Sequence, residues 1–307
     1  MRKHITLCLL AILAAIATTA QELPQVANIP GRHTTSLNGE WSYIVDVQEE
    51  GYYDYRMNPM RRGFFTDAKP KRPEDLIEYD FDRSPTMHVP GDWNTQDPQL
   101  FFYEGTVWLK RSFDYSPQQE RRTLLYFGAI NYDAHVYVNG HKAGHHIGGF
   151  TPFNYDVTDL LREGTNTVIV KVDNKRYAEA VPTQIFDWWN YGGITRDVML
   201  VSVAPTYVEN YKFSLAPTPT GNSRQHQISF SAKLNKAEAG HIVTLSIPEL
   251  KVKQQFPTSA DGTIHTALRI RNLQLWSPQN PKRYHVEIGL DGEVMVDSIG
   301  FRTIEAH

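Results

Sequence analysis

The stretch that decides the fold is Ala-His-Val-Tyr-Val-Asn-Gly-His-Lys, residues 134–142. Asn139-Gly140 separates two short runs, and both residues tolerate the positive φ angles of a two-residue hairpin turn. Outward from this hairpin, apolar residues recur at every second position in runs rich in Val, Ile, Tyr, Phe and Thr. Gly, Pro, Asn or Asp bounds most of these runs, which is typical of strands. The sequence therefore predicts an all-β protein.

Two series of strands follow one another along the chain. Before Ala204-Pro205, the pattern predicts strands at residues 39–45, 106–113, 122–127, 134–138, 166–172 and 196–203. After it, a series with fewer aromatic residues predicts strands at residues 207–214, 225–234, 240–247, 263–269, 284–290 and 293–302. We expect residues 21–204 to form a jelly-roll-like β-sandwich and residues 205–307 an immunoglobulin-like β-sandwich without its disulfide.

Residues 1–20 have the pattern of a secretory signal peptide. The basic start Met1-Arg2-Lys3-His4 precedes an apolar run, and Ala20 stands before polar Gln21. A membrane anchor would need roughly 20 apolar residues, and this run is shorter. Because Cys8 is the only cysteine, nothing after residue 20 can form a disulfide within the chain. We expect a periplasmic or secreted protein.

Charge and composition argue against several partners. Lys and Arg number 31 and Asp and Glu 34, for a formal net charge of −3, so nothing suggests nucleic acid or an anionic membrane as a partner. Gly148-Gly149 lacks the strand-to-helix context of a phosphate-binding loop, and we expect no cofactor. The long, irregular segment 51–88 is the kind of insertion that is more often functional or partner-facing, and it could support a homo-oligomer.

Residues 187–194 (DWWNYGGI) combine an acid, two indoles, an amide and a phenol beside two glycines. Aromatic faces cover the apolar C–H side of a pyranose, while carboxylate and amide groups hydrogen-bond its hydroxyls. The predicted carbohydrate-binding residues are Asp187, Trp188, Trp189, Asn190 and Tyr191. The alternative is structural: both indoles belong to the core at a corner of the sandwich, and the acid caps a turn.

Eight segments in sequence order together resemble the N-terminal part of glycoside hydrolase family 2, which includes β-glucuronidases, β-galactosidases and β-mannosidases. They are residues 36–41 (SLNGEW), 89–94 (VPGDWN), 103–108 (YEGTVW), 138–140 (VNG), 148–153 (GGFTPF), 187–197 (DWWNYGGITRD), 275–278 (LWSP) and 300–305 (GFRTIE). The fifth and sixth segments are more similar to β-glucuronidases than to the large β-galactosidases. The resemblance implies that the complete enzyme acts on terminal β-glucuronides, with terminal β-galactosides as the alternative.

The resemblance also assigns roles. It implies that Asp187 accepts hydrogen bonds from ring hydroxyls of the terminal sugar, and that both catalytic glutamates lie on a (β/α)₈ barrel after the second sandwich. Retaining glycosidases need two carboxyl groups about 5 Å apart, and no strand-helix region of the roughly 250 residues of a barrel is present. We therefore expect no catalytic residue here, and the missing C-terminal barrel as a partner. A stand-alone carbohydrate-binding module and an assembly module stay open as alternatives.

Three histidines near the hairpin, His141, His145 and His146, are candidate metal ligands. Strict alternation would place His141 and His145 on one face of a strand. No acidic residue at ligand spacing accompanies them in the sequence, so we expect a solvated strand face and no metal site.

Four further residues are expected to have structural roles. Glu104 lies in a Tyr-Glu-Gly turn and is predicted to be a hydrogen-bond acceptor rather than a general acid. Trp41, Trp93 and Trp276 are predicted to anchor the core, because large aromatic side chains dominate the buried surface of small domains.

Overall fold

The computed structural model describes residues 24–60, 72, 74, 80–181, 183–216 and 225–303. The predicted signal peptide and part of the 51–88 segment lie outside these residues. Strands dominate, and the all-β class predicted from the sequence is confirmed. Within the described ranges, no helix has the length and apolar character needed to cross a bilayer.

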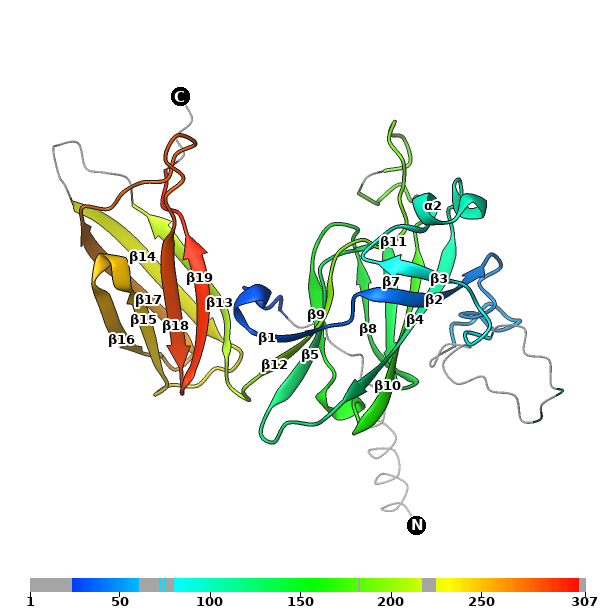
Figure 1. Ribbon diagram of the computed structural model, residues 1–307, viewed down its shortest axis with the longest axis horizontal. Helices are drawn as coiled ribbons and strands as arrows, with labels where there is room; N and C mark the ends of the chain where they lie inside the picture. The colour runs from blue at the N-terminus through cyan, green and yellow to red at the C-terminus, as the bar shows by residue number, and fades with distance from the viewer. Residues whose placement is uncertain are drawn as a thin grey trace, which may run out of the picture. The chain divides into compact units, whose positions relative to one another are not determined.

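The contacts within the chain define two compact units (Figure 1). The first contains residues 37–116 and 126–198, and the second contains residues 24–36, 117–125 and 199–303. The domain boundary expected after Ala204 stays a prediction.

The first unit is built on a six-stranded antiparallel sheet with the order β3-β2-β4-β10-β7-β8. Its strands are β2 (Gly39–Asp46), β3 (Thr86–Val89), β4 (Thr106–Tyr115), β7 (Asp133–Val138), β8 (His141–Ile147) and β10 (Gly164–Asp173). The predicted hairpin joins β7 to β8, with φ angles of 49° at Asn139 and 80° at Gly140. That prediction is confirmed.

The two faces of this sheet differ in chemistry because side chains alternate along each strand. One face, here called the aliphatic face, is formed by fully buried Val107, Leu109, Val136, Val168, Val170 and Val172. The other, here called the charged face, contains a cross-strand row in which Lys171 pairs with Trp108 on one side and His135 on the other. A second row joins Asp46, Thr106, Asp173 and Asp133.

Parts of the 51–88 segment cover the charged face. Phe81 packs in a buried cluster with Trp108, Tyr137 and Ile169, and Tyr52 packs against the same cluster. The Tyr52 ring also lies 4.6 Å from the His135 ring and beneath the Lys171 ammonium, which is 4.9 Å from its centroid. The described part of the insertion therefore serves as a lid on its own sheet.

A β-bulge changes the faces of the histidines on β8. His145 pairs with His135 and Lys142 pairs with Tyr137, with a register shift between them, so both side chains lie on the charged face. His141 pairs with Val138 and belongs to the opposite face. The expectation that His141 and His145 share a face was wrong, because a bulge inserts one extra residue and reverses the alternation.

Short elements complete the first unit. They are α2 (Trp93–Gln96), η3 (Pro98–Leu100), β6 (Ile130–Asn131), β9 (Phe153–Asp156), η4 (Thr158–Leu160) and β11 (Gly193–Ile194). The Asp92 side chain caps α2 by accepting a hydrogen bond of 2.8 Å from the Thr95 backbone amide. Trp93, in the first turn, is fully buried, as is Trp41 on β2, so both predicted core anchors are confirmed.

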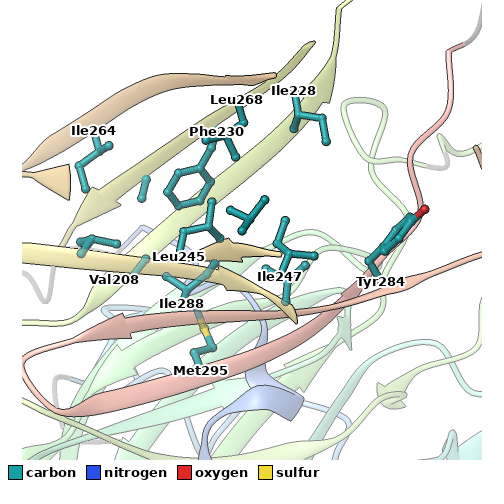
Figure 2. Close-up of a cluster of buried hydrophobic side chains, with 14 of the residues drawn as sticks. Val208, Ile228, Phe230, Leu245, Ile247, Ile264, Leu268, Tyr284, Ile288 and Met295 are labelled. Atoms are coloured by element: carbon teal, nitrogen blue, oxygen red, sulfur yellow. The ribbon is translucent and has the colours of Figure 1, made fainter. Parts of the chain in front are cut away.

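The second unit contains an immunoglobulin-like sandwich, as predicted. One sheet has the order β13-β14-β17 and the other β16-β15-β18-β19. The strands are β13 (Val208–Leu215), β14 (Gln225–Leu234), β15 (Ile242–Ile247), β16 (Val252–Pro257), β17 (Thr263–Arg271), β18 (Tyr284–Leu290) and β19 (Glu293–Ile299), with η5 (Pro248–Leu250) before β16. Side chains from both sheets, among them Phe230, Leu245 and Ile288, gather between them (Figure 2).

The second unit also includes η1 (Ile29–Gly31) and three strands that lie side by side in the order β1 (His33–Ser36), β12 (Val198–Val203) and β5 (Arg122–Phe127). The division between the units passes through the ends of β5 and β12. Trp276 is only half-buried, with the Arg302 guanidinium 5.0 Å from its ring centroid. Its prediction as a core anchor was wrong, because it lies in an irregular segment before β18 rather than on a strand.

Candidate functional site

The predicted sugar-binding residues lie on the segment that joins β10 to β11 in the first unit. Asp187 is exposed, and its carboxylate has no hydrogen bond to any other residue that the structure describes. A free carboxylate at the surface can accept hydrogen bonds from two neighbouring sugar hydroxyls, since each oxygen has two lone pairs.

An aromatic patch combines two residues of this segment with two residues that follow η3. It consists of Phe101, Phe102, Trp189 and Tyr191, with the Trp189 ring 4.9 Å from Phe101, 5.2 Å from Phe102 and 6.5 Å from Tyr191. Trp189 is held in place because its Nε1 donates a 3.2 Å hydrogen bond to the Phe101 carbonyl. Phe102 is 80% exposed, so the patch offers ring faces to solvent.

Trp188 lies outside this patch. Its side chain is 59% exposed and packs on Phe186, with ring centroids 4.9 Å apart. The Arg176 guanidinium lies 4.3 Å from the Phe186 ring centroid. The alternative interpretation, in which both indoles belong to the core, is therefore wrong for Trp188.

Asn190 is the one predicted binding residue whose side chain is buried. Its amide accepts a 3.2 Å hydrogen bond from Asn131 Nδ2 and donates to the Asn174 backbone carbonyl. Asn174 Nδ2 in turn donates a 2.8 Å bond to the Asn190 carbonyl. These bonds use both ends of the amide inside the protein, so Asn190 positions the segment rather than facing solvent.

Glycines fix the end of the segment. A Cβ on Gly192 would lie 2.0 Å from Cζ2 of the buried Trp93 ring, so only glycine fits there. The Gly192 amide donates a 2.9 Å hydrogen bond to Asn94 Oδ1, and its carbonyl accepts a 3.0 Å bond from the Trp93 amide. Gly193 has a φ of 139° and begins β11. The loop that presents Asp187 is thus anchored on α2.

Three separate segments of the sequence meet at this corner. Besides the bonds to Gly192, the Asn94 side chain donates to the backbone carbonyls of Leu100 at 2.9 Å and Tyr103 at 3.1 Å. Asn174 Oδ1 accepts a 2.8 Å hydrogen bond from the Gly105 amide. The segments at residues 89–94, 103–108 and 187–194 therefore form one hydrogen-bonded structure, in which buried asparagines satisfy the irregular backbone.

Glu104 has the structural role that was predicted for it. Its Oε1 accepts hydrogen bonds from Arg176, 2.8 Å from Nε and 2.7 Å from an Nη atom.

Sequence reasoning missed Phe101 and Phe102. Both follow η3, outside every segment that carries the family resemblance, and their signal in the sequence is only an aromatic pair before Tyr103. They add ring faces suited to the C–H side of a sugar, while the Asp187 carboxylate is suited to its hydroxyls.

The chain belongs to glycosyl hydrolase family 2. Residues 34–204 match the family's sugar-binding domain, and residues 206–302 match the domain described as glycosyl hydrolases family 2. The first unit's candidate site thus lies within the part of the chain that matches the sugar-binding domain.

Individual relatives include enzymes of two names. A putative β-glucuronidase of Formosa agariphila is 30% identical over 241 residues, covering 72% of this chain and 28% of the relative. A β-galactosidase of Thermoanaerobacter pseudethanolicus is 26% identical over 257 residues, covering 75% and 33%. The solved structure of an uncultured Clostridium sp. β-glucuronidase has a TM-score of 0.70 at 26% identity and covers 93% and 47%. This chain spans less than half the length of each.

Proposed function

We propose that this chain supplies the substrate-facing, non-catalytic part of a retaining β-glycosidase. The chain alone does not catalyse hydrolysis, and the complete enzyme acts on terminal β-glucuronides. The observation that carries the proposal is the free, exposed Asp187 carboxylate on the segment that also contributes Trp189 and Tyr191 to the aromatic patch. This segment is anchored by Asn94, Asn174 and Asn190. Membership of the family and the relatives named β-glucuronidase support it.

The test replaces Asp187 in the complete protein isolated from its native cells or expressed from the full gene. Asp187→Asn removes the charge, and a lost hydrogen bond to a charged group corresponds to roughly a 10- to 100-fold effect. We expect kcat/KM for an aryl β-glucuronide to fall by about that factor. The matched control is Asp159→Asn on η4, which is also exposed and lies outside the site. Unchanged kinetics in the Asp187 variant would rule out the proposed role.

The choice between glucuronide and galactoside is tested on the same protein. We expect the aryl β-glucuronide to be turned over with the larger kcat/KM, because two of the similar proteins above are named β-glucuronidases. A larger kcat/KM for the aryl β-galactoside would favour the other named activity.

A second candidate function, a stand-alone carbohydrate-binding module, is favoured by the exposure of the aromatic patch. Calorimetry of residues 24–303 with methyl β-glucuronide and methyl β-galactoside would reveal it as millimolar or tighter binding. If neither sugar gives a heat of binding, this part of the chain does not bind sugar alone and needs another domain to complete the pocket.

We also propose export to the periplasm or medium, supported by the composition of residues 1–20. N-terminal sequencing of the native protein should begin at Gln21. A native N-terminus at Met1 would contradict export. Assembly into a homo-oligomer is a further proposal, and a monomeric sedimentation profile of the complete protein would exclude it.

A further inference from the structure

Three side chains with metal-binding atoms converge on the charged face of the six-stranded sheet. Asp133 Oδ1 lies 2.9 Å from His145 Nε2 and 3.3 Å from His135 Nε2, and all three atoms lie within 4.8 Å of one another. No metal site was expected from the sequence, because no acid at ligand spacing accompanies the histidines. Strand pairing supplies the acid instead, since His135 on β7 lies directly opposite His145 on β8 and Asp133 lies two residues before His135.

The surroundings of the cluster are those of a built site rather than a solvated surface. His135 is only 6% exposed, and the Tyr52 ring covers it at 4.6 Å. The His145 imidazole stacks on the His135 imidazole with centroids 4.0 Å apart and is 38% exposed. One side of the cluster is therefore closed by protein, while His145 gives access from solvent.

The ring nitrogen of His135 that faces Asp133 is Nε2, and Nδ1 is not one of the three converging atoms. His135 Nδ1 is buried and has no hydrogen-bond partner in the part of the chain that the structure describes. A buried imidazole with an unsatisfied nitrogen costs stability. Nothing in the candidate sugar site uses this histidine.

We propose that Asp133, His135 and His145 bind a divalent transition-metal ion, with zinc the best fit. Two imidazole nitrogens and one carboxylate oxygen are a common ligand set for zinc. Ligand atoms 2.0–2.1 Å from a tetrahedral zinc are separated by about 3.3–3.5 Å. The separations from Asp133 Oδ1, 2.9 and 3.3 Å, are close to that value, and the two imidazole nitrogens lie within 4.8 Å of each other.

One rearrangement is needed. The two imidazole planes are within 15° of parallel, and an ion bound by both Nε2 atoms must lie close to both planes. The half-exposed His145 ring can turn out of the stack, whereas His135 is fixed beneath Tyr52. Binding would then tie edge strand β8 to β7, with water in the remaining coordination position.

Neighbouring charges set the strength of binding. Lys142 and Lys171 on the same face repel a cation, while Glu49 and Asp173 partly offset them. We therefore expect the affinity for zinc to fall when any one of the three ligands is lost.

The test uses the chain without a polyhistidine tag, freed of metal with a chelator and titrated with zinc chloride. Calorimetry and competition with a chromophoric zinc chelator measure the stoichiometry and Kd. Cobalt(II) replaces zinc to give the visible absorption bands of a tetrahedral site. The test variant is His145→Ala, which should still fold because the His145 side chain is partly exposed. The control variant is His141→Ala, because His141 lies on the same strand but on the opposite face of the sheet.

We expect one zinc per chain, the same Kd within error for the His141 variant, and a Kd raised about tenfold or more for the His145 variant. Zinc should raise the unfolding temperature of the parent chain but not of the His145 variant. No zinc binding by the parent chain, or equal binding by the His145 variant, would overturn the proposal and leave the cluster as a hydrogen-bonded Asp-His-His group.

Discussion

The two faces of the six-stranded sheet are stabilised in opposite ways. On the aliphatic face, β-branched side chains and Leu109 are fully buried and need nothing but contact. On the charged face, Lys171 and Asp173 are as deeply buried, at 4% and 2% exposure, and need partners. The comparison shows that burial alone does not distinguish an apolar core from an ionic one, because alternate residues of the same strands form the two faces.

The ionic core is coherent as a network. Glu49 lies 3.6 Å from Lys171 and 3.3 Å from Lys175, and it accepts a 2.9 Å hydrogen bond from Thr106 Oγ1. Burial opposes ionisation of Glu49, but a hydrogen bond with Asp173 and the lysine charges lower its pKa. Burial raises the pKa of Asp173. Such a network contributes little net stability when intact but makes the loss of one member costly.

The largest expected effect is on the aliphatic face. Leu109→Ala leaves a cavity between strands that cannot close around it, and we expect a loss of about 2–5 kcal/mol in the free energy of unfolding. Chemical denaturation of residues 24–303 measures it. A loss below about 1 kcal/mol would mean that this face is loosely packed.

The second-largest loss of stability is expected on the charged face. Lys171→Met keeps most of the side-chain volume but removes one of the two lysines beside Glu49, which keeps Lys175 and the Thr106 hydroxyl as partners. We expect a loss of about 2–3 kcal/mol in the free energy of unfolding. The double variant Lys171→Met with Glu49→Gln also removes the charge of the Glu49 carboxylate, and it should be more stable than the single variant. If the double variant is the less stable of the two, Lys171 acts by packing on Tyr52 rather than by charge.

A smaller effect is expected from Trp108→Phe. Trp108 Nε1 donates a 2.9 Å hydrogen bond to Asp46 Oδ2, and Asp46 keeps the amides of Glu50 and Gly51 as donors. We expect a loss of about 1–2 kcal/mol, which is less than for Lys171→Met because the carboxylate stays partly satisfied. An equal or larger loss would show that ring packing, not the hydrogen bond, dominates at this position.

The smallest effect is expected from Tyr43→Phe, about 1 kcal/mol at neutral pH. Tyr43 pairs with Leu109 and donates a hydrogen bond to Asp97. Burial and the Asp97 hydrogen bond raise its pKa to about 12, above the ordinary value near 10. Stability from this group is complete below pH 10 and is lost as pH rises toward 12. Unfolding measured from pH 9 to 12 should show a shallower decline in the variant, and an unchanged slope would contradict the assignment.

The aliphatic face could be predicted from the sequence, and the charged face could not. Alternation in residues 166–172 identifies the valines, but a lysine between valines has the same pattern whether it faces water or a lid. The lid is formed by residues far away in the sequence, around Tyr52 and Phe81. The sequence around these residues does not predict what they pack against. Asp133 and His145 likewise meet only through pairing, and a bulge shifts the register near them.

The candidate site was predicted in part, for a similar reason. Residue types on one continuous segment, Asp187 to Tyr191, indicated sugar chemistry, and the exposure of Asp187 and Trp188 is compatible with it. Phe102 joins the patch from another segment, and the inward turn of Asn190 depends on Asn131 and Asn174. Both are tertiary facts that residue types alone do not contain.

The contact between Gly192 and the Trp93 ring divides the loop into a part that can vary and a part that cannot. At position 192 any side chain would displace a buried indole, whereas Ile185 and Trp188 are exposed and constrain little around them. A library of variants should therefore tolerate most residues at 185 and 188 and almost none at 192. Selection for a new sugar could then act on the exposed half of the loop while the anchored half keeps Asp187 in place.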